Sequence, residues 1–389
     1  MFAIPLAWLQ LTHSKGKLLV ALAGITFAAI LMGMQMGFQD ALFRSALLFH
    51  NSLDCDLVLV HRSATYILNL KPFSRRRIYQ ALAVSGVQEV RRMYVQLAPW
   101  QAPDLGIKED ILVIGAEPYG TVFRDREINQ QQDKIRLPDT VLFDRGSRDD
   151  FFGAVVQEFS RAQQTQQKLF KEVSNRKVEV AGMFTMGVSF AANGTLITSD
   201  ANFLRIFAER RSGEADLGLV KTLPDSDPKQ IQQELEAYLD DDIKVLTLQE
   251  FIQLEKSYWE ESTPIGFIFG FGVVMGFIVG IIIVYQVLYK DINDHLAEYA
   301  TIKAMGYSNF YLNCVVVQQS ISLAGLGYIP AWLICYGLYG LTQASTGLQM
   351  ELSGQRSGEL FCITFLMCLI SGLLSIRRVQ KADPAEIFN

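Results

Sequence analysis

The sequence has few of the residues from which catalytic and metal centres are built. Its 389 residues include four histidines and five cysteines, and no HExxH or Cys/His pattern with zinc-ligand spacing occurs. A zinc site is therefore not expected. The chain also has no GxSxG and no GxxxxGKS or GxxxxGKT phosphate loop, so no motif predicts that it hydrolyses ATP itself. We expect no catalytic residues and no cofactor.

The placement of the cysteines, the small net charge and the scattered aspartates argue against three further kinds of site. Four cysteines lie in or near long apolar runs, which leaves Cys55 without a disulfide partner in the segment 39–261. The formal net charge is only -5, so there is no electrostatic case for binding nucleic acid. Asp104, Asp110, Asp144 and Asp149 have no spacing that pairs them for acid/base work, and we expect scattered surface carboxylates.

Charge is missing altogether from four long stretches, and these stretches dominate the chain. The uncharged runs cover residues 18–38, 262–289, 304–350 and 360–376. A helix of about 20 apolar residues crosses the hydrocarbon core of a bilayer. We therefore predict four transmembrane helices, at 18–38, 262–289, 311–341 and 360–376. The third run is long enough to raise the alternative of a fifth span, because glycines and Pro330 punctuate it.

Basic residues near the ends of these runs decide the expected orientation. They are Lys15 and Lys17 before the first run, Lys290 and Lys303 between the second and third, and Arg377, Arg378 and Lys381 after the fourth. With four spans they all fall on one side, so the positive-inside rule places both termini in the cytoplasm. The segment 290–310 and the tail 377–389 are then cytoplasmic, whereas 39–261 and a short loop at 342–359 are periplasmic.

The first 17 residues have a pattern of their own. Ile4, Leu6, Trp8, Leu9 and Leu11 precede a basic end, which is typical of a helix lying in the lipid headgroup layer. A plain extension of the first span is the alternative for residues 1–17. A cleaved signal peptide is a further alternative, although the apolar run exceeds a usual h-region and no small-x-small site directly follows it.

The segment 39–261 is predicted to be a mixed α/β domain inserted between the first two spans. Strand candidates are "DCDLVLV", "DILVIG" and "KVEVAGMF", and helix candidates are "SRRRIYQALAVSG" and "DPKQIQQELEAYLDD". "DREINQQQDKIRL" is expected to be a loop, and "SRAQQTQQKLFKEVSNRK" a solvated helix or loop. Stalk helices, "FQDALFRSALLFHNSL" and "LTLQEFIQLEKSYWEES", are expected at the two ends of the domain.

Glycines recur at four-residue spacing in two of the predicted spans. They are Gly33 and Gly37 in the first span and Gly272, Gly276 and Gly280 in the second. This spacing allows the backbones of two helices to approach closely, and packing within one chain is the favoured interpretation. The uncharged runs offer no ionisable side chain for a proton or ion relay, which disfavours a proton-coupled transporter.

The stretch "LYKDINDHLAEYATIKAMGYSNFYL" stands between the second and third spans. We predict one helix in it, from about residue 292 to residue 305, which ends at Gly306. Its acidic residues lie early and Lys303 lies late, as the helix dipole favours. Ile292, Leu296 and Tyr299 share one face. Because a plain connector needs only a few residues, this helix is expected to dock a cytoplasmic partner.

Four stretches together resemble one family. "EYATIKAMGYS" is similar to the coupling-helix segment of the MacB/FtsX superfamily of ABC transporter permeases, and "RRVQKADPAEIF" to the end of that family's chains. "VEVAGMFTMGVSFAANGTLITSDANFLRIF" resembles the second half of its extracytoplasmic domain, and "YWEESTPIGFIFGFG" the start of its second span. The order of these stretches matches as well, and the similarity is greatest to the DevC subgroup of glycolipid-type exporter permeases.

The resemblance implies a homodimeric permease in the bacterial inner membrane that works by mechanotransmission. ATP would be bound by a separate DevA-like ATPase, because no ATPase domain is attached. The implied coupling residues are Glu298, Tyr299, Ile302, Lys303 and Gly306. The other implied partners are a DevB-like periplasmic adaptor, a TolC-like outer-membrane channel and membrane lipid, in a tripartite system that exports lipid or glycolipid. An FtsX-like permease that activates a periplasmic enzyme and a membrane-tethered sensor are the alternatives.

Overall fold

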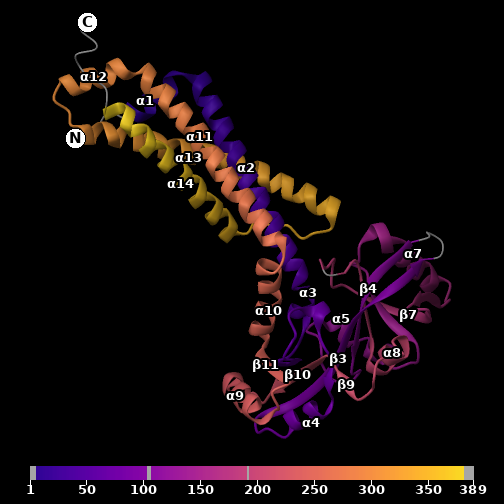
Figure 1. The fold of residues 1–389 in the computed structure, drawn as a ribbon. Helices are drawn as coiled ribbons and strands as arrows, with labels where there is room; N and C mark the ends of the chain where they lie inside the picture. The colour runs from indigo at the N-terminus through magenta and orange to yellow at the C-terminus, as the bar shows by residue number, and fades with distance from the viewer. Residues whose placement is uncertain (1–5, 103–106, 191, 381–389) are drawn as a thin grey trace. The chain divides into compact units, whose positions relative to one another are not determined.

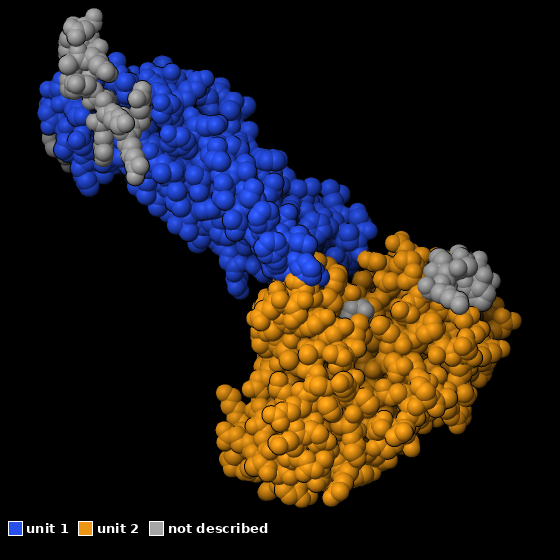
Figure 2. All heavy atoms as spheres, in the orientation of Figure 1, with its two compact units in different colours: residues 1–41, 264–389 blue, residues 42–263 orange. Residues whose placement is uncertain are grey.

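The computed structural model describes residues 6–102, 107–190 and 192–380. It divides into two compact units: unit 1 comprises residues 1–41 and 264–389, and unit 2 comprises residues 42–263 (Figure 2). Helices make up unit 1, and a large sheet lies in unit 2 (Figure 1). The Asp-Pro-Ala-Glu ending at 383–386, which contributed to the family resemblance, lies outside the described residues.

Unit 1 is built from long apolar helices. Its elements are α1 (Leu6–His13), α2 (Lys15–Ala46), α11 (Pro264–Asp294), α12 (Leu296–Ala304), α13 (Asn309–Thr346) and α14 (Gly354–Gln380), of which α2 continues into unit 2. Within the described ranges four of them, α2, α11, α13 and α14, are long and apolar enough to cross a membrane. The long third run forms one helix with Pro330 inside it, so it is not split into two spans.

The core of unit 1 lies between these four long helices. Ile25 of α2, Leu288 of α11, Leu323 of α13 and Met367 of α14 are fully buried in one cluster. Large apolar side chains also cover the outside of α11, where Phe267 is 73% exposed. An apolar exterior of this extent is expected of a surface that contacts lipid or another protein.

The glycines at four-residue spacing lie where neighbouring helices of unit 1 come close. The facing residues are Cys335 and Leu360 for Gly33, Tyr339 for Gly37, Gln35 for Gly272, Leu31 and Met32 for Gly276, and Ala28 and Met367 for Gly280. A Cβ atom on Gly33 would lie 2.9 Å from the Cys335 Sγ, closer than real Cβ atoms come to their neighbours. Glycine therefore permits each of these approaches inside a single chain.

Unit 2 is organised around a nine-stranded mixed sheet in the order β11-β1-β10-β3-β4-β8-β5-β7-β6. The strands are β1 (Leu57–His61), β3 (Val87–Ala102), β4 (Ile107–Ala116), β5 (Thr140–Asp144), β6 (Leu169–Val173), β7 (Arg176–Phe184), β8 (Thr195–Ser199), β10 (Leu217–Thr222) and β11 (Ile243–Thr247), and β2 (Phe73–Ser74) pairs with β9 (Glu214–Ala215). The predicted strands β1, β4 and β7 are confirmed. The 16-residue β3 pairs with β10, β4 and β6, so it joins both halves of the sheet.

Nine short helical segments belong to unit 2. They are α3 (Leu48–Ser52), η1 (Ile67–Asn69), α4 (Arg76–Leu82), α5 (Arg126–Asn129), α6 (Gln132–Ile135), α7 (Asp149–Gln164), α8 (Asp200–Ile206), α9 (Pro228–Tyr238) and α10 (Leu248–Glu261) in the described part of the chain. The predicted helices α4 and α9 are confirmed. Gly86 follows α4 with a positive φ of 87°, and a capping box of Thr247 and Glu250 starts α10.

Two polar stretches are more ordered than their composition predicts. The predicted loop after Asp125 forms α5 and α6, because the Asp125 side chain caps α5 and Ile128 and Ile135 reach the core. The second stretch holds the end of α7 and then β6, which the prediction of a solvated helix or loop missed. Only Val173 of β6 is fully buried and the other side chains are half-buried or exposed, so the sequence of β6 lacks a clear apolar alternation.

The expectation of a surface carboxylate is wrong for Asp144. The side chain is fully buried, and it accepts hydrogen bonds from the backbone N–H groups of Gly146 (2.8 Å), Met186 (2.9 Å) and Gly187 (3.0 Å). Burial raises its pKa to about 6 against the opposing effect of these bonds. Its position at the end of the buried strand β5 was the available signal.

The expectation of surface carboxylates is confirmed for two of the other three aspartates. Asp110 and Asp149 are exposed. Asp104 lies outside the described residues.

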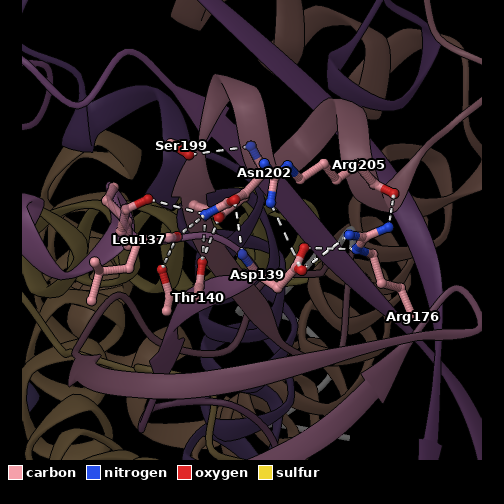
Figure 3. A network of polar contacts seen from close by, with 9 residues as sticks. Leu137, Asp139, Thr140, Arg176, Ser199, Asn202 and Arg205 are labelled. Carbon is pink, nitrogen blue, oxygen red and sulfur yellow. Dashed lines mark hydrogen bonds and ion pairs between the residues drawn. The ribbon is translucent and has the colours of Figure 1, made fainter.

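A second buried polar group, Asn202 of α8, fixes the turn that precedes β5 (Figure 3). Its Nδ2 donates to the carbonyl oxygens of Leu137 (2.8 Å) and Thr140 (3.2 Å), and its Oδ1 accepts the N–H of Asp139 (3.0 Å). Asp139 has a positive φ of 57°, and its carboxylate pairs with Arg176 (2.7 Å). These bonds hold a left-handed residue in place, which is a stabilising role.

Candidate functional site: the coupling segment

Residues 290–310, the coupling segment, contain two helical pieces. α11 runs to Asp294, and α12 covers only Leu296–Ala304, so the prediction of one helix from residue 292 is wrong at its start. No proline or glycine interrupts residues 281–294, and the helix of the second span therefore continues. The break comes at His295, whose Nδ1 lies 2.9 Å from the Asp291 carbonyl oxygen.

The end of α12 is as predicted. Gly306 has a positive φ of 94°, and its N–H donates to the Lys303 carbonyl (3.0 Å). Tyr307 N–H reaches back to the Ile302 carbonyl (3.3 Å). This left-handed glycine closes the helix, and the Ser308 side chain then caps α13. A short turn thus returns the chain into the bundle.

One face of the coupling segment is buried in unit 1. Ile292 and Tyr299 are fully buried, and Leu296 is partly buried beside them. They pack with Ala7 of α1 and Leu312 of α13 in one apolar cluster. The shared face predicted from the sequence therefore contacts the chain's own helices.

Gln10 of α1 stands at the centre of a polar network under this face. Its Oε1 accepts hydrogen bonds from the Tyr299 hydroxyl (3.1 Å) and the Gln319 side chain (3.2 Å), and its Nε2 donates to Glu298 (3.2 Å). Gln319 also donates to Asp291 (3.3 Å). Gln10, Tyr299, Gln319 and Asp291 are buried. Buried polar groups that satisfy one another in this way fix the relative positions of their helices.

Charge reinforces the same attachment. Lys17 of α2 pairs with Asp294 at the end of α11, with 2.5 Å between Nζ and Oδ2. Burial raises the pKa of the Tyr299 hydroxyl, and the nearby carboxylates of Asp291 and Glu298 raise it further. Tyr299 therefore remains a protonated donor to Gln10. The coupling segment is held to α1, α2 and α13 as one body.

The turn that follows α12 carries exposed apolar side chains. Met305 is 65% exposed, Phe310 is 76% exposed, and Tyr307 lies exposed between them. We name these three residues the apolar turn. Exposed apolar side chains that gather at one short turn are characteristic of a protein-binding surface.

The predicted coupling residues fall into different environments. Glu298 and Gly306 are exposed, Ile302 and Lys303 are half-buried, and Tyr299 is fully buried. Tyr299 thus supports the segment from inside.

Sequence reasoning missed Gln10 and Gln319 of the network, and it also missed His295 at the break between α11 and α12. A glutamine in the middle of an uncharged apolar run was the signal that could have pointed to Gln319.

The described residues offer no site for a metal ion: no group of three or more His, Cys, Asp or Glu side chains in them has a suitable arrangement. What the coupling segment does offer is an exposed contact surface on a rigidly held turn.

Comparison with known proteins identifies one segment of the chain. Residues 267–384 match the family described as FtsX-like permease C-terminal. This segment contains α12, the apolar turn and α13, and it supports the resemblance to the MacB/FtsX superfamily of ABC transporter permeases. No curated protein matches the chain.

Two solved structures are similar to part of the chain at low scores. One is the periplasmic region of MacB from Actinobacillus actinomycetemcomitans, with 12% identity, a TM-score of 0.33, and coverage of 52% of this chain and 93% of that one. The other is the extracellular domain of the noncanonic ABC-type transporter YknZ from Gram-positive bacteria, with 13% identity, a TM-score of 0.33, and coverage of 49% and 98%. The support for the resemblance to the family therefore comes from residues 267–384.

Proposed function

We propose that the chain is the permease subunit of an ABC-type exporter and that a separate ATPase docks on its coupling segment. The observation that carries this proposal is the exposed apolar turn inside the FtsX-like segment. The turn is fastened to α1 and α13 through Gln10, Tyr299 and Gln319. A partner that pushes on it would displace several membrane helices together, and no ion relay is needed.

The proposal includes a topology and an assembly. Both termini and the coupling segment lie in the cytoplasm, α2, α11, α13 and α14 cross the inner membrane, and unit 2 lies in the periplasm. Two copies of the permease bind two copies of a DevA-like ATPase, which binds the ATP. A DevB-like adaptor and a TolC-like channel complete a tripartite system of the DevC type that exports lipid or glycolipid by mechanotransmission.

A second function uses the same machinery. The alternative is an FtsX-like regulatory permease that activates a periplasmic enzyme, and the match to the FtsX-like permease family is compatible with it. Both functions require the ATPase on the coupling segment, and they differ in the periplasmic partner.

The first experiment is affinity purification of the tagged chain in mild detergent, with identification of co-purifying proteins and an ATPase assay. Met305→Asp and Phe310→Asp place a charge on the apolar turn, and because both side chains are exposed these variants fold normally. We expect them to retain less than a tenth of the ATPase. Leu223→Asp, a matched change at an exposed leucine of unit 2, retains it. Equal recovery in all variants would contradict docking at the turn.

The copurified periplasmic protein distinguishes the two functions. An adaptor supports export, whereas a cell-wall or other periplasmic hydrolase supports the regulatory function. Absence of any ATPase, together with no ATP hydrolysis, contradicts both.

Substitutions at Glu298 test whether the exposed acidic side chain of the coupling segment contributes to ATPase docking. Glu298→Lys reverses its charge and is expected to reduce assembly with the ATPase or ATP-driven activity, with membrane insertion intact. Glu298→Gln is the matched control, because it removes the charge and keeps an oxygen that accepts the hydrogen bond of Gln10. Normal coupling in Glu298→Lys would remove Glu298 from the proposed contact.

A further inference from the structure

Four aromatic side chains from three separate parts of unit 2 form one cluster. Tyr66 adjoins η1, Phe190 lies in the loop before β8, and Tyr258 and Trp259 are on α10. The rings of Tyr66 and Tyr258 are stacked with centroids 3.9 Å apart, and Trp259 meets Phe190 edge-on at 4.9 Å. We name these four residues the aromatic cluster.

The aromatic cluster is an exposed feature. Phe190 is 40% exposed, and Tyr66, Tyr258 and Trp259 are half-buried. A set of aromatic rings that only served a core would be buried, as Phe143, Phe152 and Trp100 are elsewhere in unit 2. Phe190 is therefore exposed, and the other three residues remain partly accessible.

A buried carboxylate fixes the geometry of the aromatic cluster. Glu255 is 1% exposed, and it accepts hydrogen bonds from the Trp259 indole N–H (2.8 Å) and from the backbone N–H of Ile67 (2.8 Å). One carboxylate thus ties the tryptophan of α10 to the residue that follows Tyr66. The hydrogen-bonding group of Trp259 is therefore satisfied from inside unit 2.

The position of the aromatic cluster along the chain indicates what that contact is. Trp259 precedes the uncharged run that begins at Ser262 by three residues, about 5 Å along a helix. Tryptophan and tyrosine accumulate where a membrane meets water, because their rings are apolar and their N–H and O–H groups are polar. Glu260 and Glu261 lie beside the cluster, so an uncharged or zwitterionic lipid surface fits it better than an anionic one.

We propose that the aromatic cluster is a lipid-binding surface with which unit 2 rests in the headgroup layer of the bilayer. In the proposed topology, on which this inference rests, α11 enters the membrane shortly after Trp259, whereas Tyr66 and Phe190 come from other parts of the fold. Contact through all of them would bring three separate segments of unit 2 to the lipid. This role is independent of the proposed ATPase and persists in its absence.

The test places the full-length chain in phosphatidylcholine vesicles, with and without lipid brominated on the upper part of the acyl chain. Bromine quenches tryptophan fluorescence only over a short distance. Phe190→Trp adds a reporter within the aromatic cluster at an exposed position. Tyr238→Trp is the matched control, because Tyr238 ends α9 and α9 contacts the first turn of α10 through Gln232 and Glu250 (2.8 Å), at the end away from Trp259.

We expect brominated lipid to quench the added fluorescence of Phe190→Trp at least threefold more than that of Tyr238→Trp. Trp259→Phe, measured against the unsubstituted chain, should remove a quenched component. Equal quenching of the two added tryptophans would overturn the proposal. The tryptophan at residue 190 could instead be shielded from both brominated lipid and aqueous acrylamide, and more strongly at a higher protein-to-lipid ratio. That result would overturn the proposal and show that a second copy of the chain covers the aromatic cluster.

Discussion

Tyr299 of α12 donates a hydrogen bond to Gln10 of α1 over 3.1 Å, and both side chains are buried. Residues almost three hundred positions apart therefore fix the coupling segment to the first helix of the chain. Because Gln10 also accepts from Gln319, the loss of the Gln10 side chain removes the acceptor of the Tyr299 hydroxyl and of one Gln319 N–H group.

Gln10→Leu should consequently be more damaging than its small change in volume suggests. We expect a loss of about 2–4 kcal/mol in the free energy of unfolding, since buried donors without acceptors cost about 1–3 kcal/mol each. Tyr299→Phe should cost about 1 kcal/mol. Thermal unfolding in detergent measures both, and the double variant should show clear non-additivity. Thr301→Ala, which removes an exposed hydroxyl bonded only within α12, should change little, and a comparable loss there would refute the argument.

The helix contacts at glycine predict a contrast between two alanine substitutions. Gly37→Ala should destabilise unit 1, because the new methyl group meets the ring of Tyr339, whose hydroxyl bonds the Gly33 carbonyl at 2.5 Å. Gly340→Ala has open space around the new atom and should be neutral or slightly stabilising. Melting temperatures in the same detergent provide the comparison. Indistinguishable values for the two variants would mean that α2 and α13 are less closely packed than described.

Asn202 should be important for the stability of unit 2. Asn202→Ala leaves the carbonyl groups of Leu137 and Thr140 and the N–H of Asp139 without their partner, so we expect a loss of about 2–4 kcal/mol. Asn51→Ala, at an exposed asparagine of α3, serves as control. The effect is measured as the resistance of unit 2 to limited proteolysis at increasing denaturant concentration. Unchanged resistance of the Asn202 variant would show that the turn before β5 is held by other contacts.

The stability of unit 2 should depend on pH through Glu255. Burial raises the pKa of this carboxyl group from 4.5 to about 7. The folded state then holds its proton more tightly than the unfolded state, so the contribution to stability is most favourable below pH 4.5 and is lost as pH rises to about 7. The shift corresponds to about 3 kcal/mol.

The neighbouring His50 has the opposite pH dependence and provides a control on the sign. Its Nε2 lies 3.4 Å from Glu255, and burial lowers its pKa to about 3, so its contribution is lost as pH falls below 6.5. Glu255→Gln removes only the first effect. The melting temperature of this variant relative to the unsubstituted chain should rise between pH 5 and pH 8, and a constant difference would contradict the assignment.

The helices and several strands were predictable because their signals are local. Uncharged runs of sufficient length revealed α2, α11, α13 and α14, and β-branched runs revealed β1, β4 and β7. The break at His295 was not predictable, because no proline or glycine marks it. Likewise, the sequence predicts a surface position for Asp144, because its hydrogen-bond donor at Met186 lies far away in the chain.

The coupling segment was recognisable from its length and its family pattern, but its attachment was not. Gln10 lies in a short helix at one end of the chain, and Gln319 lies inside a long apolar helix. Only the folded bundle brings them to Tyr299. The aromatic cluster is similar, because Tyr66, Phe190 and Trp259 are far apart in sequence and become neighbours through the sheet.

The pairing of β1 affects how unit 2 is assembled during synthesis. β1 lies between β10 and β11 in the sheet, with Leu57 opposite Val220 on one side and Thr247 on the other. β1 is the first strand of unit 2 to be synthesised, but its partners β10 and β11 are the last two. Contacts of such long sequence separation slow folding. Until then β1 has two open edges in a run of buried apolar residues, which is a hazard for aggregation. Truncation of the chain before β11 should yield an insoluble product, because one edge of β1 then stays open.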